Sequence, residues 1–167
     1  MIYYISGGAR SGKSAYAMRW ALELSDQPVY LATARAWDDD FKARIARHQD
    51  DRDERWTNLE EETRPSQLEL PERVVVIDCV TLWLTNLFVE LKQDIELCLE
   101  FFKKEIDQLA KRNTTYIIIS NELGMGLHPD TESGRKFTDL QGWANQYVAA
   151  QSEKAIFMVS GLPLTLK

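Results

Sequence analysis

The residues with the clearest chemical potential form the run Gly7-Gly-Ala-Arg-Ser-Gly-Lys-Ser14. This run has the Gly-x-x-x-x-Gly-Lys-Ser spacing of a phosphate-binding P-loop. Its glycines let successive backbone N–H groups turn inward toward phosphate oxygens. Lys13 can reach the terminal phosphates of a nucleotide, and the Ser14 hydroxyl can ligate Mg²⁺. The pattern therefore predicts a nucleoside triphosphate site in which Lys13 is catalytic.

The segments on either side of this loop favour the same interpretation. Residues 2–6 are typical of a short strand, and a helical pattern begins at Ser14. A strand, a loop and a helix in this order place the free N–H groups and the positive end of the helix dipole at the phosphates. The alternative, a glycine-rich turn without a ligand, is disfavoured because the motif and its context agree.

Acidic and amide side chains follow two further predicted strands. Asp78 ends the run 73–78, and a carboxylate in that position can hold the Mg²⁺ shell of a P-loop site. Asn121 and Glu122 follow the strand 116–120, at the sheet edge that also carries the P-loop. The alternatives are a strand-end cap for Asp78 and a plain glycine turn for residues 121–126.

His48 is the more reactive candidate of the two histidines. Arg44, Arg47 and Arg52 surround it in the sequence and would form a cationic pocket suited to phosphates. Their positive charge would favour the neutral, nucleophilic form of the imidazole. On the residues alone, a solvent-facing histidine on a charged helix is the competing interpretation. His128 precedes a proline in a loop and is interpreted as structural or peripheral.

Elements that could position these residues alternate regularly along the chain. Apolar runs predict strands at 2–6, 28–32, 73–78, 116–120 and 155–160, and residues 161–167 predict a terminal turn with a short edge strand. Helical patterns begin at 14 and occupy about 38–50, 82–91, 94–112 and 131–153, whereas 60–71 is a predicted loop. Unbroken apolar strands alternating with helices predict an α/β fold with a mostly parallel sheet that helices flank on both faces.

Two helices have a predicted inward face. These faces are Ile95, Leu99, Phe102, Ile106 and Leu109 on the first, and Phe137, Leu140, Trp143, Ala144 and Tyr147 on the second. Four tryptophans, Trp37, Trp56, Trp83 and Trp143, could stack on a base, although each is more often a core residue.

The composition limits the classes of partner. The chain of 167 residues predicts one domain, 1–167, and its net charge of −6 disfavours nucleic acid and anionic membrane surfaces. Cys79 and Cys98 lack a metal-site spacing and predict buried thiols in a reducing cytoplasm. No apolar run reaches membrane-spanning length. A strand that starts at residue 2 leaves no room for a signal peptide.

Several stretches, taken together and in order, are more specific than any one of them. They are Gly7-Gly-Ala-Arg-Ser-Gly-Lys-Ser14, Ala32-Thr-Ala34, Arg44-Ile-x-x-His48-x-x-x-Arg52-x-x-x-Trp56, Asp78-Cys-Val-Thr-Leu-Trp-Leu-Thr-Asn86, Asn121-Glu-Leu-Gly-Met-Gly126, Arg135-x-Phe137, Gly142-x-x-Asn145-Gln146 and Ser160-Gly-Leu-Pro-Leu164. Over nearly the whole chain they resemble the bifunctional adenosylcobinamide kinase/adenosylcobinamide-phosphate guanylyltransferase family of cobalamin biosynthesis.

The resemblance implies two reactions in a cytoplasmic, RecA-like P-loop protein that can form homotrimers. One transfers the γ-phosphate of ATP or GTP to the aminopropanol hydroxyl of adenosylcobinamide. The other transfers GMP from GTP to adenosylcobinamide phosphate through a GMP–histidine intermediate, for which His48 stands at the matching position. The implied metal is Mg²⁺ on Ser14 and Asp78. The implied nucleotide-binding residues are Gly7, Gly8, Ala9, Arg10, Ser11, Gly12, Lys13, Ser14, Ala32, Thr33, Ala34, Gln49, Asp50, Asp51, Arg52, Glu60 and Asp78.

Two other functions compete with this one. A simple P-loop kinase for another small alcohol would leave His48 incidental. A nucleotide-binding switch protein would hydrolyse little and signal by shape. The Arg44-x-x-x-His48-x-x-x-Arg52 spacing favours the dual enzyme, because neither alternative needs a nucleophilic histidine. We expect the helix at about 38–50 to bring His48 to the α-phosphate for the second reaction only.

Overall fold

The computed structural model describes residues 1–35 and 52–167. Within this part of the chain, seven strands form one sheet in the order β3-β2-β4-β5-β1-β6-β7. The strands are β1 (Ile2–Gly7), β2 (Val29–Ala32), β3 (Thr57–Glu60), β4 (Val74–Asp78), β5 (Thr115–Ile119), β6 (Lys154–Val159) and β7 (Leu162–Thr165). Neighbouring strands are parallel except β6 and β7, which are antiparallel. One strand, β5, therefore separates the P-loop strand β1 from β4, which carries Asp78.

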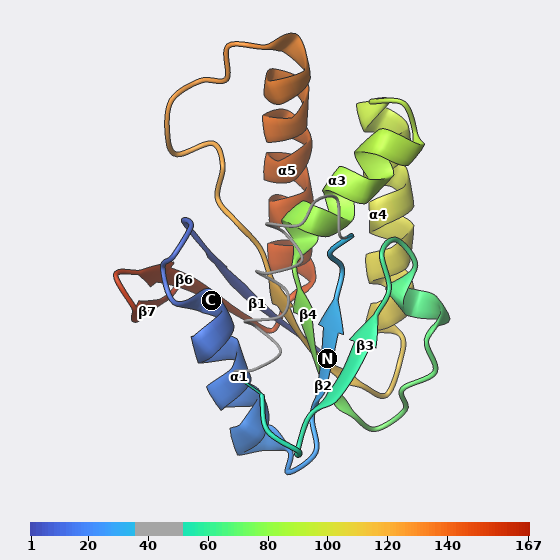
Figure 1. The fold of residues 1–167 in the computed structure, drawn as a ribbon, viewed down its shortest axis with the longest axis vertical. Helices are drawn as coiled ribbons and strands as arrows, with labels where there is room; N and C mark the ends of the chain where they lie inside the picture. Colours follow the sequence, from blue (N-terminus) through green and yellow to red (C-terminus); the bar gives the residue numbers. More distant parts are fainter. Residues whose placement is uncertain (36–51) are drawn as a thin grey trace.

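Helices cover both faces of the sheet (Figure 1). They are α1 (Lys13–Leu24), α3 (Val80–Glu90), α4 (Ile95–Ala110) and α5 (Glu132–Gln151), with a short 3₁₀ helix, η1 (Pro65–Gln67). α1 packs on one face, and α3, α4 and α5 group together on the other. The predicted α/β fold, with a mostly parallel sheet that helices flank on both faces, is confirmed.

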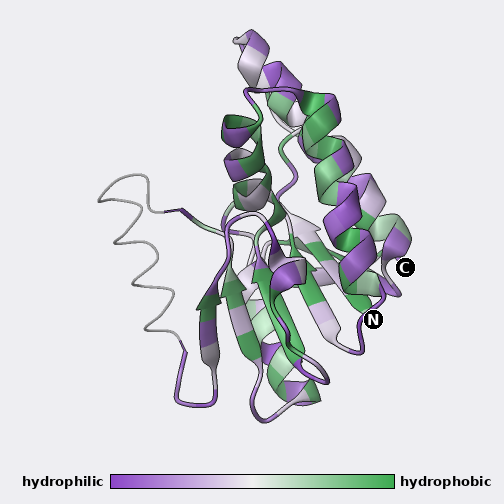
Figure 2. Cartoon of the chain, turned by 90° about the vertical axis from the view of Figure 1, so that its right-hand side faces the viewer, coloured by the Kyte–Doolittle hydropathy of each residue, from purple (hydrophilic) through white to green (hydrophobic). Residues whose placement is uncertain are grey.

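Successive side chains along a strand point to opposite faces of the sheet, which explains the two core layers. In β4, Val75 and Ile77 join the core beneath α3, α4 and α5, whereas Val74 and Val76 join the core beneath α1. A strand buried on both faces needs apolar residues at every position, which is why the sequence shows continuous runs. Figure 2 shows this as hydrophobic colour on the central strands and hydrophilic colour on the outward surfaces of the helices.

The five predicted buried strands are all present, within one or two residues of their expected ends. The edge strand predicted within 161–167 is present as β7. One strand was missed: β3 lies inside a stretch without an apolar run, and most of its side chains are exposed. It forms through parallel pairing with β2, in which Leu31 pairs with Leu59. The predicted helix at about 38–50 lies outside the described residues.

The two predicted inward faces had different outcomes. On α4, Phe102, Ile106 and Leu109 are fully buried, as expected. On α5, Trp143 is 44% exposed, so its predicted inward position is wrong. Two polar residues, Gln141 and Asn145, are buried instead. The buried stripe of α5 therefore runs through amide side chains that periodicity of apolar residues cannot reveal.

The remaining predictions concern tryptophans, cysteines and membranes. Trp56 and Trp83 are core residues, and Trp37 lies outside the described ranges. Cys79 and Cys98 are buried free thiols, as predicted. Among the helices found at 1–35 and 52–167, none has the length and apolar character needed to cross a bilayer.

Candidate active site

The P-loop begins at the carboxyl end of β1, and its shape depends on glycine. Gly7 has φ +151°, and a Cβ there would lie 2.5 Å from the carbonyl oxygen of Met158 on the neighbouring strand β6. Gly12 has φ +93° and caps the N-terminus of α1. Any larger side chain would be strained at either position. The loop therefore curls tightly into the helix, and the N–H groups of the first turn of α1 are directed at the loop.

Lys13 is buried and spans this loop. Its Nζ donates hydrogen bonds to the carbonyl oxygens of Gly7, at 3.0 Å, and Gly8, at 2.6 Å. Ser11 lies in the same loop, and its buried Oγ has no hydrogen-bond partner among the described residues. A buried hydroxyl without a partner is costly in a folded protein. Both groups are suited to receive phosphate oxygens at the mouth of the loop.

Ser14 and Asp78 come together from distant parts of the chain. The Ser14 hydroxyl donates to Asp78 Oδ2 at 2.8 Å, and the Tyr30 hydroxyl donates to the same oxygen at 2.6 Å. Burial, followed by the negative charge of Asp78, raises the pKa of Tyr30. Tyr30 therefore stays protonated and holds the carboxylate in place. A hydroxyl and a carboxylate beside a phosphate site are the hard oxygen ligands that Mg²⁺ prefers, so these residues fit the implied metal.

Arg52 lies next to this carboxylate cluster. Its guanidinium carbon is 3.8 Å from the centroid of the Tyr30 ring. Its Nε and Nη1 are buried and lack a hydrogen-bond partner within 1–35 and 52–167. An arginine that stacks on an aromatic ring while keeping buried donors unused is well suited to bind an anion. Arg52 was predicted from the sequence, but its contact with Tyr30 was not.

Residues 32–34 continue from β2 beside the end of β4. Thr33 is fully buried, and all of its polar groups have partners in the protein. Its N–H donates to Asp78 O, its Oγ1 bonds both backbone groups of Cys79, and its carbonyl accepts from the Asn86 side chain. Thr33 therefore fastens β2 to β4, while Ala32 and Ala34 are partly exposed at the same edge.

The predicted site residues divide into two groups. The P-loop, Ser14, Ala32, Asp78 and Glu60 lie at or beyond the carboxyl ends of the parallel strands, where Ala32 pairs in register with both Asp78 and Glu60. His48, Gln49, Asp50 and Asp51 lie outside the described residues, so their place in the site stays a prediction. Sequence reasoning missed Tyr30, because it stands in an apolar strand and resembles a core residue.

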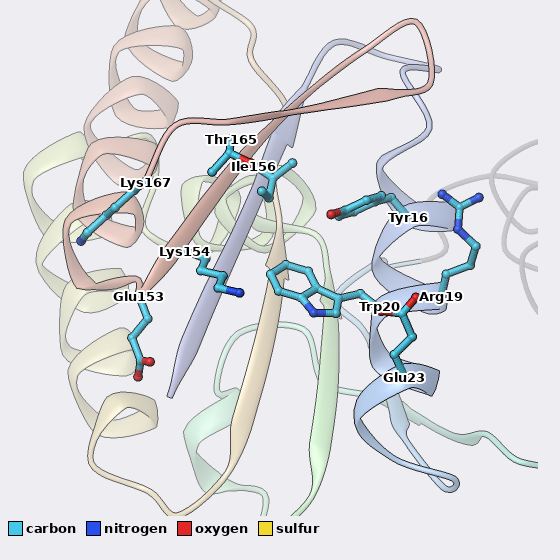
Figure 3. Close-up of a pocket in the computed structure, with 9 residues that line it drawn as sticks. All are labelled: Tyr16, Arg19, Trp20, Glu23, Glu153, Lys154, Ile156, Thr165 and Lys167. Atoms are coloured by element: carbon cyan, nitrogen blue, oxygen red, sulfur yellow. The ribbon is translucent and has the colours of Figure 1, made fainter.

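A separate groove of about 610 Å³ lies between α1 and the β6–β7 hairpin (Figure 3). Its lining includes Tyr16, Trp20, Lys154 and Thr165. None of the P-loop residues and none of the Ser14–Asp78 cluster line it. The groove is therefore distinct from the phosphate site. Trp20 stacks on Tyr3 with ring centroids 4.6 Å apart, which makes it a packing residue at this edge.

Taken together, the sheet, the P-loop and the Ser14–Asp78 pair define an α/β protein of the P-loop, nucleotide-binding class. A family model described as cobinamide kinase / cobinamide phosphate guanyltransferase matches residues 3–166. The chain belongs to this family, as its motifs predicted. It is therefore an enzyme of cobalamin biosynthesis with kinase and guanylyltransferase activities.

Curated relatives agree with this assignment. The chain is 40% identical over 169 residues to the bifunctional adenosylcobalamin biosynthesis protein CobP of Pseudomonas aeruginosa, covering 98% of this chain and 95% of that protein. It is 31% identical over 182 residues to the bifunctional adenosylcobalamin biosynthesis protein CobU of Escherichia coli, covering 100% of both. Among solved structures, an ATPase domain has a TM-score of 0.45 and 14% identity, over 93% of this chain and 68% of that one. A likeness this distant adds nothing to the family assignment.

Proposed function

We propose that both transfers use one nucleotide site at the carboxyl ends of β1 and β4. In the first, the aminopropanol hydroxyl of adenosylcobinamide attacks the γ-phosphorus of ATP or GTP, and the nucleoside diphosphate leaves. In the second, GTP donates GMP to adenosylcobinamide phosphate. The observation that carries the proposal is that Lys13 and the Ser14–Asp78 pair lie together at the P-loop, with Asp78 reaching it from the end of β4.

The P-loop would supply binding and charge neutralisation to both reactions. Backbone N–H groups of the loop and the N-terminus of α1 would hold the phosphates. The Lys13 ammonium would exchange its bonds with the Gly7 and Gly8 carbonyls for bonds to phosphate oxygens. Ser14 and Asp78 would hold Mg²⁺, which neutralises charge on the phosphates when bound.

The residues beside β2 and β3 would contact the rest of the nucleotide. Arg52 offers buried, unused donors next to Asp78, which suits a phosphate oxygen. Ala32, Ala34 and Glu60 surround the same edge and would contact the nucleoside, with Thr33 holding them in place. Gln49, Asp50 and Asp51 complete the proposed set by family resemblance.

His48 would act only in guanylyl transfer. Its neutral imidazole nitrogen attacks the α-phosphorus of GTP, the bond to the bridging oxygen breaks, and pyrophosphate leaves. An oxygen of adenosylcobinamide phosphate then attacks the same phosphorus and breaks the N–P bond, which gives adenosylcobinamide-GDP. By the same resemblance we propose that the protein is cytoplasmic and forms a homotrimer. Light scattering coupled to gel filtration measures the molar mass and so tests the trimer.

Radioactive labelling tests the histidine route. Protein incubated with α-labelled GTP should retain label after denaturation, whereas protein incubated with γ-labelled GTP should not. The label should be lost in acid and kept in alkali, as a phosphoramidate requires. It should be absent in His48→Ala and normal in His128→Ala, a matched control because His128 is exposed in a loop. Active, GTP-binding protein without covalent α-label would overturn the route and favour a simple kinase.

A further inference from the structure

A polar cluster at the end of β5 has no part in the nucleotide site described above. Because β5 lies between β1 and β4, the residues that follow it emerge between the P-loop and Asp78. The N–H of Glu122 donates to the carbonyl oxygen of Gly7 at 3.2 Å. The same oxygen accepts the bond from Lys13 Nζ at 3.0 Å. Glu122 is therefore fixed beside the lysine that reaches the terminal phosphates.

The Glu122 side chain is held from α5. Its Oε1 accepts a hydrogen bond of 3.0 Å from Asn145 Nδ2, which also donates to the Asn121 carbonyl at 3.1 Å. Asn145 Oδ1 in turn accepts from Ser120 Oγ at 2.6 Å and from Gln141 Nε2 at 2.9 Å. The amide of Asn145 thus has a single orientation, which presents its NH₂ group to the carboxylate.

The cluster is buried where α5 packs on the end of β5, and burying polar side chains there costs free energy. Ser120, Gln141 and Asn145 are at most 5% exposed. Buried polar groups destabilise a protein unless their bonds are satisfied, and a network fixes geometry more sharply than apolar packing does. Glu122 is half-buried at the end of this network. The cluster therefore directs one carboxylate to one place beside the P-loop.

The two carboxylates Asp78 and Glu122, which lie beside the P-loop, have different partners. Asp78 Oδ2 already accepts from Ser14 and Tyr30, which suits a metal shell. Asn145 uses only Oε1 of Glu122, and a carboxylate has a second oxygen that can take a proton. Tyr4, buried nearby, has its pKa raised by burial and by the charge of Glu122, so Tyr4 stays protonated and is no competing base.

We propose that Glu122 accepts the proton of the acceptor alcohol in the kinase reaction, with Asn145 as its positioning residue. This rests on the proposed shared site. The alcohol oxygen bonds to the γ-phosphorus, the bond from that phosphorus to the leaving diphosphate breaks, and the hydroxyl proton moves to Glu122. Guanylyl transfer needs no such group, because a neutral imidazole and a phosphate oxygen attack without losing a proton.

The test measures both activities on the same Glu122→Gln protein. The amide keeps the size of the side chain and removes its basicity. Phosphate transfer from γ-labelled ATP to adenosylcobinamide should fall about 100-fold or more, in the range found for general bases. Covalent labelling from α-labelled GTP, and transfer of that label to adenosylcobinamide phosphate, should stay within about twofold of the wild type.

Asn145→Ala should lower kcat of the kinase reaction with little change in KM for ATP, again with normal GMP transfer. Gln146→Ala is the matched control, because Gln146 is the exposed neighbour of Asn145 on α5. Kinase activity within about fivefold of the wild type in Glu122→Gln would overturn the proposal, and so would equal loss of both activities. Failure of the shared site itself would be seen differently, as normal GMP transfer by a Lys13→Ala protein that has lost kinase activity.

Discussion

Single residues at the phosphate site differ in how far the sequence revealed them. Lys13, Ser14 and Asp78 were predicted from a motif and a strand end, because their roles depend on local spacing. Tyr30 was missed, and the stacking of Arg52 on it was not predicted, because their contact joins two segments that only the pairing of β2 with β3 brings together. For His48 the surrounding arginines suggested a nucleophile but also fit an exposed helix, and family resemblance decided between the two interpretations.

Lys13→Ala should impair both reactions. Both use a triphosphate, and loss of one charged donor to the phosphates costs about 100-fold or more in rate. Initial rates of γ-phosphate transfer and of α-label incorporation measure the two effects. Lys111→Ala, at the exposed C-terminal end of α4, is the control for loss of a positive charge. Normal GMP transfer by Lys13→Ala would contradict the shared site.

At the scale of elements, strands buried on both faces were predictable, whereas the exposed edge strand β3 was not. β4 and β5 are continuous apolar runs, so their sequence alone predicts a parallel sheet interior. β3 has no such pattern, because its side chains face solvent and its pairing with β2 comes from backbone bonds. The predicted inward position of Trp143 was wrong for a related reason. Buried amide side chains occupy the face of α5 to which the spacing of apolar residues had assigned it.

Two tryptophans on neighbouring helices test these assignments. Trp83 is fully buried on α3, packs on Phe102 with ring centroids 4.8 Å apart, and donates from Nε1 to the Thr63 carbonyl. Trp83→Ala should lower the free energy of unfolding by about 3–5 kcal/mol, because it leaves a cavity and an unpaired carbonyl. Trp143→Ala removes the same side chain from an exposed position and should change it by about 0.5 kcal/mol or less. Urea titration followed by circular dichroism measures both, and similar losses would contradict the orientation of α5.

At the scale of the whole molecule, the two thiols report on global unfolding. Cys79 and Cys98 are buried in opposite cores. Burial, followed by the charge of Asp78, raises the pKa of Cys79 to about 12, and burial followed by Asp94 raises the pKa of Cys98 to about 11. Native protein should therefore react with a chromogenic disulfide reagent at pH 8 only through unfolding, at a rate that rises with urea. Fast reaction of either thiol in native protein would contradict its burial.

The raised pKa values of the two thiols also predict how the free energy of unfolding changes in alkaline solution. A thiol in the unfolded chain ionises near pH 8.5, whereas these two remain protonated in the folded protein up to about pH 11 and 12. Their contribution to the free energy of unfolding is therefore fully present below about pH 8.5 and is lost as the pH rises toward those values. Urea titrations should show that the free energy of unfolding of the wild-type protein is lower at pH 10 than at pH 8. The difference should be smaller in a variant in which both cysteines are replaced by alanine.

The place of β1 in the middle of the sheet bears on how the chain is made. Ile2 pairs with Tyr116 on β5, and Tyr3 pairs with Lys154 on β6. β1 must therefore wait for β5 and β6, which lie far along the chain, before it has a neighbour on either side. Pairings of such sequence separation form slowly. The strand that leads into the P-loop thus has both of its neighbours only after β6 has been made, and nucleotide binding would report that the interior of the sheet is complete.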